Sequence, residues 1–206
     1  MDFHIDNIDQ LFPRELSEQR KGRLRDGLNQ FYSRNTDSKL YTEFYSESEY
    51  PYFLQGDLIR EIRFPSWDNN NHDFSKQYYD AIIISNTCDL DESNKRHVPK
   101  QVVIAKLITL EGFAEALRLK QVNNPELILQ NLRNQEYSNL MYLPEVNGVE
   151  YIAALDEISS ISQEEIISLK NDFYQNRIKS LDLFGYYLFM FKLSYHLCRL
   201  PEETDR

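Results

Sequence analysis

The segment 85–92, Ser-Asn-Thr-Cys-Asp-Leu-Asp-Glu, contains the side chains best suited to chemistry, and it directly follows an apolar run. Polar residues at the end of a strand have a rigid support, as many functional residues do. His97 follows Cys88 by nine residues, and a cysteine–histidine pair can activate a thiolate nucleophile. Cys88 and His97 are therefore candidate catalytic residues, although no glycine-rich turn accompanies Cys88 to form an oxyanion hole.

The same segment also fits two non-catalytic interpretations. Asn86 and Asp89 can cap backbone donors in a turn while the cysteine packs as a small hydrophobic side chain. Asp89, Asp91 and Glu92 offer oxygen ligands for a divalent cation, but the spacing lacks the glycine and the later bidentate Glu of a calcium loop. We therefore predict a polar loop with Asn86, Thr87 and Asp89 as candidate binding residues. We predict neither a metal site nor a cofactor.

The composition restricts the class of protein. The chain has 206 residues, with 33 acidic and 23 basic side chains, so its net charge is −10. An aromatic content of 13% gives enough apolar surface for a folded core, which argues against global disorder. The acidic charge disfavours nucleic-acid binding, because phosphate contacts need clustered Lys and Arg. A basic face over residues 14–25 leaves nucleic acid open as a partner, although acidic side chains lie among its basic ones.

The sequence predicts a cytoplasmic protein with no membrane association. The N-terminus shows no basic region followed by an apolar stretch, which is the pattern of a signal peptide. The longest apolar run, Leu183–Phe191, has nine residues, whereas roughly 20 are needed to span a bilayer.

Periodicity and turn signals predict the elements that position these residues. We expect a helix over 13–31, a linker or exposed loop over 33–50, and helices over 111–120, 125–134, 163–178 and 181–200. Strands are expected over 52–54, 57–64, 78–85 and 101–108, with a polar loop over 65–77. Asn147-Gly148 predicts a hairpin joining 140–146 to 149–155, because both turn positions need positive φ. Ser162 and Glu165 form a capping box.

These elements predict an α+β fold: a small, partly closed β-barrel with an N-terminal helix, a helical insertion and two C-terminal helices. A mixed sheet covered by helices on one face is the alternative. The chain divides into an N-terminal helix and linker (1–50), a barrel with its helical insertion (51–161), and a C-terminal helical segment (162–206) that packs on the barrel or on a partner.

Four segments, in this order along the chain, resemble strands of the PemK-like (MazF-like) toxin family. They are Gly56-Asp57-Leu58-Ile59, Ala81-Ile82-Ile83-Ile84-Ser85, Val102-Val103-Ile104-Ala105-Lys106-Leu107-Ile108-Thr109 and Ala154-Leu155-Asp156-Glu157-Ile158-Ser159-Ser160-Ile161. The resemblance covers about half of the chain. It implies an SH3-like barrel, in which Thr109 takes the position of the family's active-site hydroxyl.

The chain departs from that family where catalysis is concerned. An Arg-Pro pair usually precedes the buried strand of the family and its arginine assists RNA cleavage, but here the segment is Lys76-Gln77-Tyr78-Tyr79-Asp80. The resemblance therefore implies the barrel more than it implies a ribonuclease.

The last predicted helix is apolar around its whole circumference and must be enclosed by a core or by a partner. Phe184, Tyr187, Phe191 and Tyr195 form one stripe of this helix, at spacings of three or four residues. Because aromatic residues are enriched at interface centres, this stripe is the candidate interface with a protein partner or a second copy. A purely structural role in the core remains the alternative.

Three functions follow from these features. The first is a non-catalytic interaction or regulatory subunit of a bacterial conflict system, such as toxin–antitoxin or antiphage defence, built on a PemK-like barrel. The second is an endoribonuclease in which Thr109 acts with Arg60, Arg63 or Lys106 in place of the missing arginine. The third is a hydrolase that uses Cys88 and His97.

Overall fold

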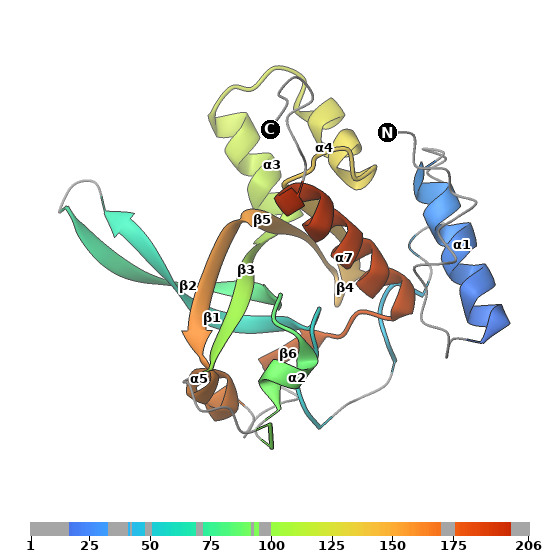
Figure 1. Cartoon of the computed structure of the whole chain (residues 1–206). Coiled ribbons are helices and arrows are strands. Elements are labelled where there is room, and N and C mark those ends of the chain that lie inside the picture. Colours follow the sequence, from blue (N-terminus) through green and yellow to red (C-terminus); the bar gives the residue numbers. More distant parts are fainter. Residues whose placement is uncertain are drawn as a thin grey trace, which may run out of the picture.

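A curved antiparallel sheet of six strands, in the order β4-β5-β3-β2-β1-β6, forms the centre of the computed structural model (Figure 1). The structure describes residues 17–32, 41, 43–47, 51–68, 72–91, 93–94, 100–169 and 176–198. The strands are β1 (Leu58–Asp68), β2 (Asp73–Ile83), β3 (Gln101–Thr109), β4 (Leu140–Val146), β5 (Val149–Ser162) and β6 (Arg177–Lys179). The helices are α1 (Glu18–Tyr32), α2 (Thr87–Leu90), α3 (Leu110–Leu119), α4 (Pro125–Arg133), α5 (Gln163–Ser168) and α7 (Leu183–Cys198). The predicted α+β class is confirmed.

The strand pairing does not close the sheet into a barrel, which corrects the expectation of a partly closed one. β4 and β6 lie at opposite edges, and no pairing joins these edges among the described residues. β6 pairs with only the first two residues of β1, and β4 pairs with only the first half of β5. The distal part of β1 and the second half of β5 therefore each have one edge without a neighbouring strand.

The main core lies between one face of the sheet and α7. Leu188 and Phe189 of α7 are fully buried there, together with strand residues such as Leu58 and Ile82. Phe44, which lies in the segment expected to be an exposed linker, is only 1% exposed and packs in the same core. Its carbonyl accepts a hydrogen bond from the Asp182 N–H at 3.0 Å, which places this segment beside the start of α7.

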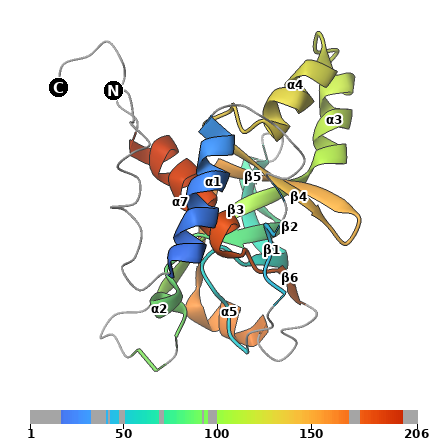
Figure 2. The same ribbon diagram turned by 90° about the vertical axis from the view of Figure 1, so that its right-hand side faces the viewer.

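A glycine makes this close approach possible. A Cβ added at Gly185 would lie 2.5 Å from the Phe44 carbonyl oxygen, so no larger residue fits without movement of the backbone. On another side of α7, Leu183, Tyr187 and Phe191 pack around the buried Leu24 of α1, and α1 and α7 lie side by side (Figure 2). The chain therefore covers most of its apolar last helix with its own segments.

Two further apolar clusters surround the sheet. One lies within its curvature, between the β1–β2 hairpin and the second half of β5, and includes Ile62, Phe64 and Ile104. The other packs α3 and α4 against β4 and β5 through Leu132, Tyr142 and Ile152. The helical insertion predicted between strands is thus confirmed, with α3 and α4 close to their expected bounds.

The local turn signals are also confirmed. Asn147 and Gly148 both have positive φ, at 53° and 81°, and join Val146 to its partner Val149 in the expected hairpin. The hydroxyl of Ser162 accepts a hydrogen bond from the Glu165 N–H at 3.2 Å and caps α5.

The helix expected over 163–178 differs in the structure. α5 ends at Ser168, and Arg177–Lys179 form the edge strand β6. The physical reason is a buried ion pair: Arg177 Nε lies 2.9 Å from Oδ2 of Asp57, which has no exposed surface. Burial raises the pKa of Asp57, while Arg177, Ser180 and the Leu54 N–H act in the opposite direction. This contact holds the segment alongside the start of β1.

The loop expected over 65–77 is instead mostly strand. β1 and β2 remain paired as far as Asp68 and Asp73 and form a hairpin that projects from the sheet (Figure 1). The bend at its base is a bulge, in which two residues of β1 take the place opposite Asp80, and Glu61 has a φ of 53°. Periodicity does not reveal this hairpin because its outer strands carry mostly polar side chains.

None of the helices in the described part of the chain is both long enough and apolar enough to cross a membrane.

Candidate functional site

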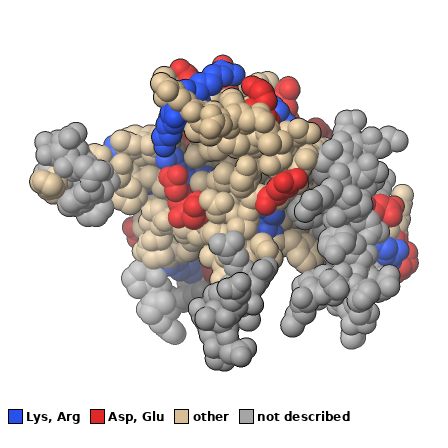
Figure 3. Space-filling view, turned by 90° about the horizontal axis from the view of Figure 1, so that it is seen from above, with Lys and Arg blue, Asp and Glu red and all other residues tan. Residues whose placement is uncertain are grey.

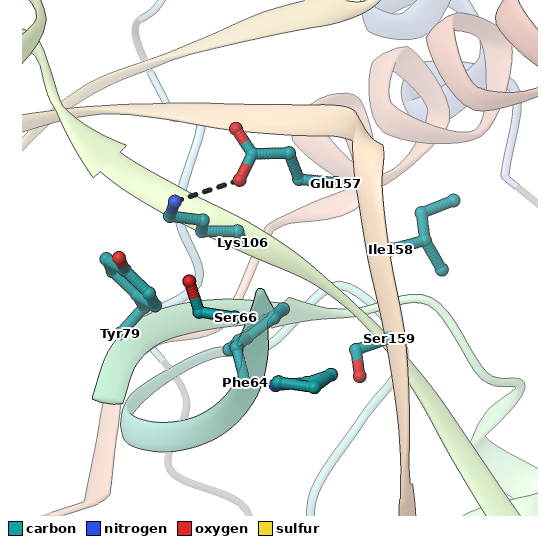
Figure 4. Close-up of a pocket in the computed structure, with 8 residues that line it drawn as sticks. Phe64, Ser66, Tyr79, Lys106, Glu157, Ile158 and Ser159 are labelled. Carbon is teal, nitrogen blue, oxygen red and sulfur yellow. Dashed lines mark hydrogen bonds and ion pairs between the residues drawn. The ribbon is translucent and has the colours of Figure 1, made fainter. Parts of the chain in front are cut away.

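A pocket of about 210 Å³ lies where the hairpin faces β5. Residues 64–66 of β1 and 157–159 of β5 line opposite sides of it, with Tyr79 from β2 and Lys106 from β3 (Figure 4). The volume is below the range of roughly 300–1,000 Å³ that is usual for small-molecule and cofactor sites. It suits one large side chain better than a whole ligand.

Lys106 is the cation of this pocket, and two neighbours hold it. Its Nζ lies 2.8 Å from Oε2 of Glu157 and 3.9 Å from the centre of the Tyr79 ring. The Lys106 side chain is 17% exposed and that of Glu157 is 51% exposed. Glu157 is therefore the charged group of the pair that solvent reaches more easily.

The edge of β5 beside the pocket has backbone groups that point away from the sheet. Val103 directs both of its backbone groups toward the β2 side, since its N–H donates to Ser85 Oγ and its carbonyl accepts from Ile84 N–H. Ser160 is the cross-strand partner of Val103, and the two residues form a pair without mutual hydrogen bonds. The N–H and C=O of Ser160 therefore point away from β3. Because backbone direction repeats every two residues, those of Ile158 point the same way. In the part of the chain that the structure describes, no hydrogen bond to either backbone is found on that side. Ile158 is 40% exposed.

The facing edge of β1 is less suited to pairing. Ile83 exchanges backbone hydrogen bonds with residues 56 and 57, so by alternation Tyr79 and Gln77 face β1, and their partners Ile62 and Phe64 face β2. Pro65 therefore directs its backbone toward the outer edge of β1. Its missing N–H removes no hydrogen bond between β1 and β2. β5 is therefore the better of the two edges for an additional strand.

A second polar cluster lies on the opposite face of the sheet, around Tyr151. The Tyr151 hydroxyl donates to Asp80 Oδ2 at 3.3 Å, and Tyr151 pairs across the strands with Thr109. Burial is the main cause that raises the pKa of Tyr151, the Asp80 carboxylate adds to it, and the Arg60 guanidinium opposes it. The structure thus brings Arg60 and Asp80 to Tyr151, which is the cross-strand partner of the predicted catalytic residue Thr109.

Thr109 itself acts as a helix cap. Its exposed hydroxyl accepts a hydrogen bond from the Gly112 N–H at 3.1 Å at the start of α3. Lys106 lies three residues away on β3, so the two side chains point to opposite faces of the sheet. Arg63, another proposed substitute for the family's arginine, forms an ion pair with Glu165 at 3.2 Å. Of the three candidate cations, Arg60 is the one whose charge acts on Tyr151, the cross-strand partner of Thr109.

The polar loop after β2 has the geometry of a capped turn. Asn86 caps α2 by accepting a hydrogen bond from the Cys88 N–H at 2.9 Å. Thr87 accepts from the Gln55 N–H at 3.0 Å, and Gln163 donates to the Asp89 carbonyl at 3.2 Å. Cys88 is a free, exposed thiol, which corrects the interpretation that it packs as a small hydrophobic side chain. His97 lies outside the described residues.

The predicted stripe on the last helix is divided between different surroundings. Phe184 packs against the main core, whereas Tyr187 and Phe191 pack against α1. Tyr195 is 62% exposed, and Leu197 near the end of α7 is 61% exposed. The exposed apolar part of α7 is therefore its last turn, not a continuous face.

No group of three metal-ligating side chains occurs among the residues that the structure describes. On the face shown in Figure 3, acidic and basic side chains are interspersed, and neither sign forms a continuous patch. No protein-family model matches the chain, and no curated protein is significantly similar to it.

The sequence predicts Lys106 only as a substitute for a catalytic arginine, and no pattern in it marks Phe64, Tyr79, Glu157 or Ile158 as site residues. The one signal available was Lys106 itself, a charge inside the apolar run Val102–Ile108. A charge in an otherwise buried strand marks a face that opens to solvent or to a polar partner. Its partner Glu157 is 51 residues away in sequence, and no pattern in the sequence connects the two.

Proposed function

We propose that the chain is a protein-binding, non-catalytic subunit whose binding site is the gap between β1 and β5. The observation that carries this proposal is the edge of β5, where Ile158 and Ser160 direct backbone groups beside an open pocket. An edge of this kind is a template for pairing with another chain, and proteins usually cover or blunt it.

The setting of this function rests on the family resemblance alone. The resemblance implies an SH3-like barrel, and among the described residues the six-stranded sheet stays open between β4 and β6. By that resemblance, the chain is a regulatory or interaction subunit of a bacterial conflict system, such as toxin–antitoxin or antiphage defence, that acts in the cytoplasm. The last turn of α7 is a second candidate contact for a partner or a second copy.

Co-purification tests the proposal and distinguishes the two surfaces. The tagged chain is isolated from its source cells, and bound proteins are identified by mass spectrometry. We expect a stoichiometric partner that Ile158→Glu removes and Tyr195→Ala retains, since both residues are exposed and neither change disturbs the core. Repeated recovery of the chain without a partner contradicts the proposed function. If Tyr195→Ala removes the partner and Ile158→Glu does not, the binding site lies on α7.

An endoribonuclease is the second candidate function, because Arg60 and Asp80 act on Tyr151, which pairs across the strands with Thr109. A cation and a hydroxyl on one face are suited to stabilising charge at a scissile phosphate. The test is cleavage of single-stranded RNA by the wild-type chain, Arg60→Ala and Thr109→Ser, the last of which keeps the helix cap. Cleavage that Arg60→Ala abolishes supports a nuclease, and a wild-type chain without cleavage excludes it.

The hydrolase that uses Cys88 is the third candidate, and its thiol is accessible. Labelling by iodoacetamide that leaves every measurable activity unchanged excludes this function.

A further inference from the structure

We infer that the gap between β1 and β5 accepts an extended peptide segment of a partner protein, which adds as a strand to β5 and places one apolar side chain in the pocket. The inference rests on the proposed function and specifies the occupant of the same site. Three separate properties of the gap define that occupant: its backbone groups, its walls and its charge.

The backbone groups require a peptide. Ile158 and Ser160 lie two residues apart, and each directs one N–H and one C=O away from β3. A ligand that satisfies these groups must repeat donor and acceptor at the period of a strand, as an extended peptide does. A sugar or nucleotide has no such repeat.

The facing strand is the weaker edge for pairing. A direct pairing of β1 with β5 would use the outward N–H donors of β1, and Pro65 lacks the donor at its position. The same proline leaves an apolar ring on the wall of the pocket. β1 therefore supplies side-chain contacts to the occupant, and β5 supplies the hydrogen bonds.

The walls select an apolar side chain at the centre of the peptide. Phe64, Pro65 and Ile158 line the pocket from both sides, and its volume is about 210 Å³. The side chain of Ile158 lies on the other side of β5, so this residue borders the pocket through its backbone (Figure 4). A side chain seated in the pocket would lie against Phe64 and Tyr79 and would continue the apolar cluster to which both belong.

The charge selects basic residues beside the apolar one. Glu157 is 51% exposed at the rim, and its neighbour Asp156 is also exposed. Lys106, in contrast, is 17% exposed and lies over the Tyr79 ring. The exposed charges on the β5 side of the gap are therefore acidic, and the net charge of −10 favours approach of a basic segment.

The test begins with a phage library of random heptapeptides selected against the full chain. We expect enriched peptides with a central Leu, Ile, Val or Phe and at least one flanking Lys or Arg. The best peptide is then synthesised with and without N-methylation next to its central residue, which removes a backbone donor and keeps the side chain. We expect N-methylation to weaken binding by about tenfold, the effect of losing one or two hydrogen bonds.

Variants of the chain locate the site. Ser160→Pro removes one outward donor without removing a bond to β3, and Glu157→Gln removes the rim charge; each should weaken binding of the peptide severalfold. Tyr78→Ala is the matched control, because Tyr78 is 66% exposed on the same hairpin but lies on the opposite face from Tyr79. Thermal unfolding of each variant shows that the fold is retained.

Hydrogen exchange provides a measurement that needs no variant. In the free chain the amides of Ile158 and Ser160 should exchange faster than that of Ser159, and the peptide should slow both. Absence of a selected peptide motif, an acidic motif, or binding that N-methylation does not affect overturns strand addition. If no peptide binds while the tagged chain still retains its stoichiometric partner, strand addition fails and the proposed function stands.

Discussion

The surroundings of α7 and the gap between β1 and β5 differ in how completely the chain buries them. α7 is apolar on all sides, and the chain covers it with the sheet, with α1 and with the segment that carries Phe44. The gap exposes Ile158 and two outward backbone positions, and no described segment covers them. Apolar side chains can be buried by any segment of suitable shape, whereas an open strand edge needs another backbone at the right distance.

The largest expected effect separates the two regions by stability. Phe189→Ala should lower the free energy of unfolding by about 3–5 kcal/mol, because Phe189 of α7 is fully buried against the sheet. Ile158→Thr at the gap should change it by only about 0.5 kcal/mol, the usual size for a surface substitution. Urea denaturation of both variants measures the difference. Equal losses would mean that the gap is part of the core.

A smaller effect tests how closely the Phe44 segment approaches α7. Gly185→Ala places a Cβ 2.5 Å from the Phe44 carbonyl and should cost about 1–3 kcal/mol through the forced shift. Gly22→Ala in α1 is the matched control, since a Cβ there meets nothing within 4 Å. It should stabilise the chain by about 0.5–1 kcal/mol through helix propensity. A neutral Gly185→Ala would show that the segment does not lie against α7.

The pH dependence of stability sharpens the comparison, because α7 carries a buried lysine. Lys192 is 6% exposed, its Nζ donates to the carbonyls of Gln135 and Tyr137, and burial lowers its pKa to about 8. In an unfolded chain a lysine has a pKa of roughly 10.4. Between these values the unfolded chain binds more protons, so stability should rise as the pH increases from about 8 toward 10.

Tyrosines near the same core limit that rise. Burial raises the pKa of Tyr41 to about 12, against roughly 10 for an unfolded chain. Above pH 10 the folded chain binds more protons, so stability should fall. Urea midpoints measured from pH 7.5 to 11.5 should therefore pass through a maximum, and Lys192→Met should remove the rising limb only. A rising limb that persists in this variant would assign it to another group.

The smallest expected effect concerns the loop after β2. Cys88 is exposed, so Cys88→Ser should change the free energy of unfolding by less than about 0.5 kcal/mol. Asn86→Ala is the contrasting change, since it removes the cap of α2 and should cost about 1 kcal/mol. Thermal unfolding compares the two variants. If Cys88→Ser destabilises the chain more than Asn86→Ala does, the Cys88 side chain is buried, as the sequence predicted.

Elements defined by local signals were predictable from the sequence. Asn147 and Gly148 determine their turn through their own backbone preferences, and Ser162 caps the helix that directly follows it. α3 and α4 follow from periodicity together with Pro125 at the first helical position. Each of these signals acts within about four residues, which is why a sequence pattern reveals it.

Contacts between distant segments decided the rest. The apolar residues over 181–200 predict from the sequence alone that the last helix must be enclosed. Only the tertiary structure decides that the sheet, α1 and Phe44 enclose most of it. Likewise, Arg177 lies in an edge strand and not in a helix because its partner Asp57 lies 120 residues earlier in the chain. The gap itself depends on where two strand edges stop pairing. That outcome is set by the curvature of the whole sheet, because register and twist accumulate over every strand.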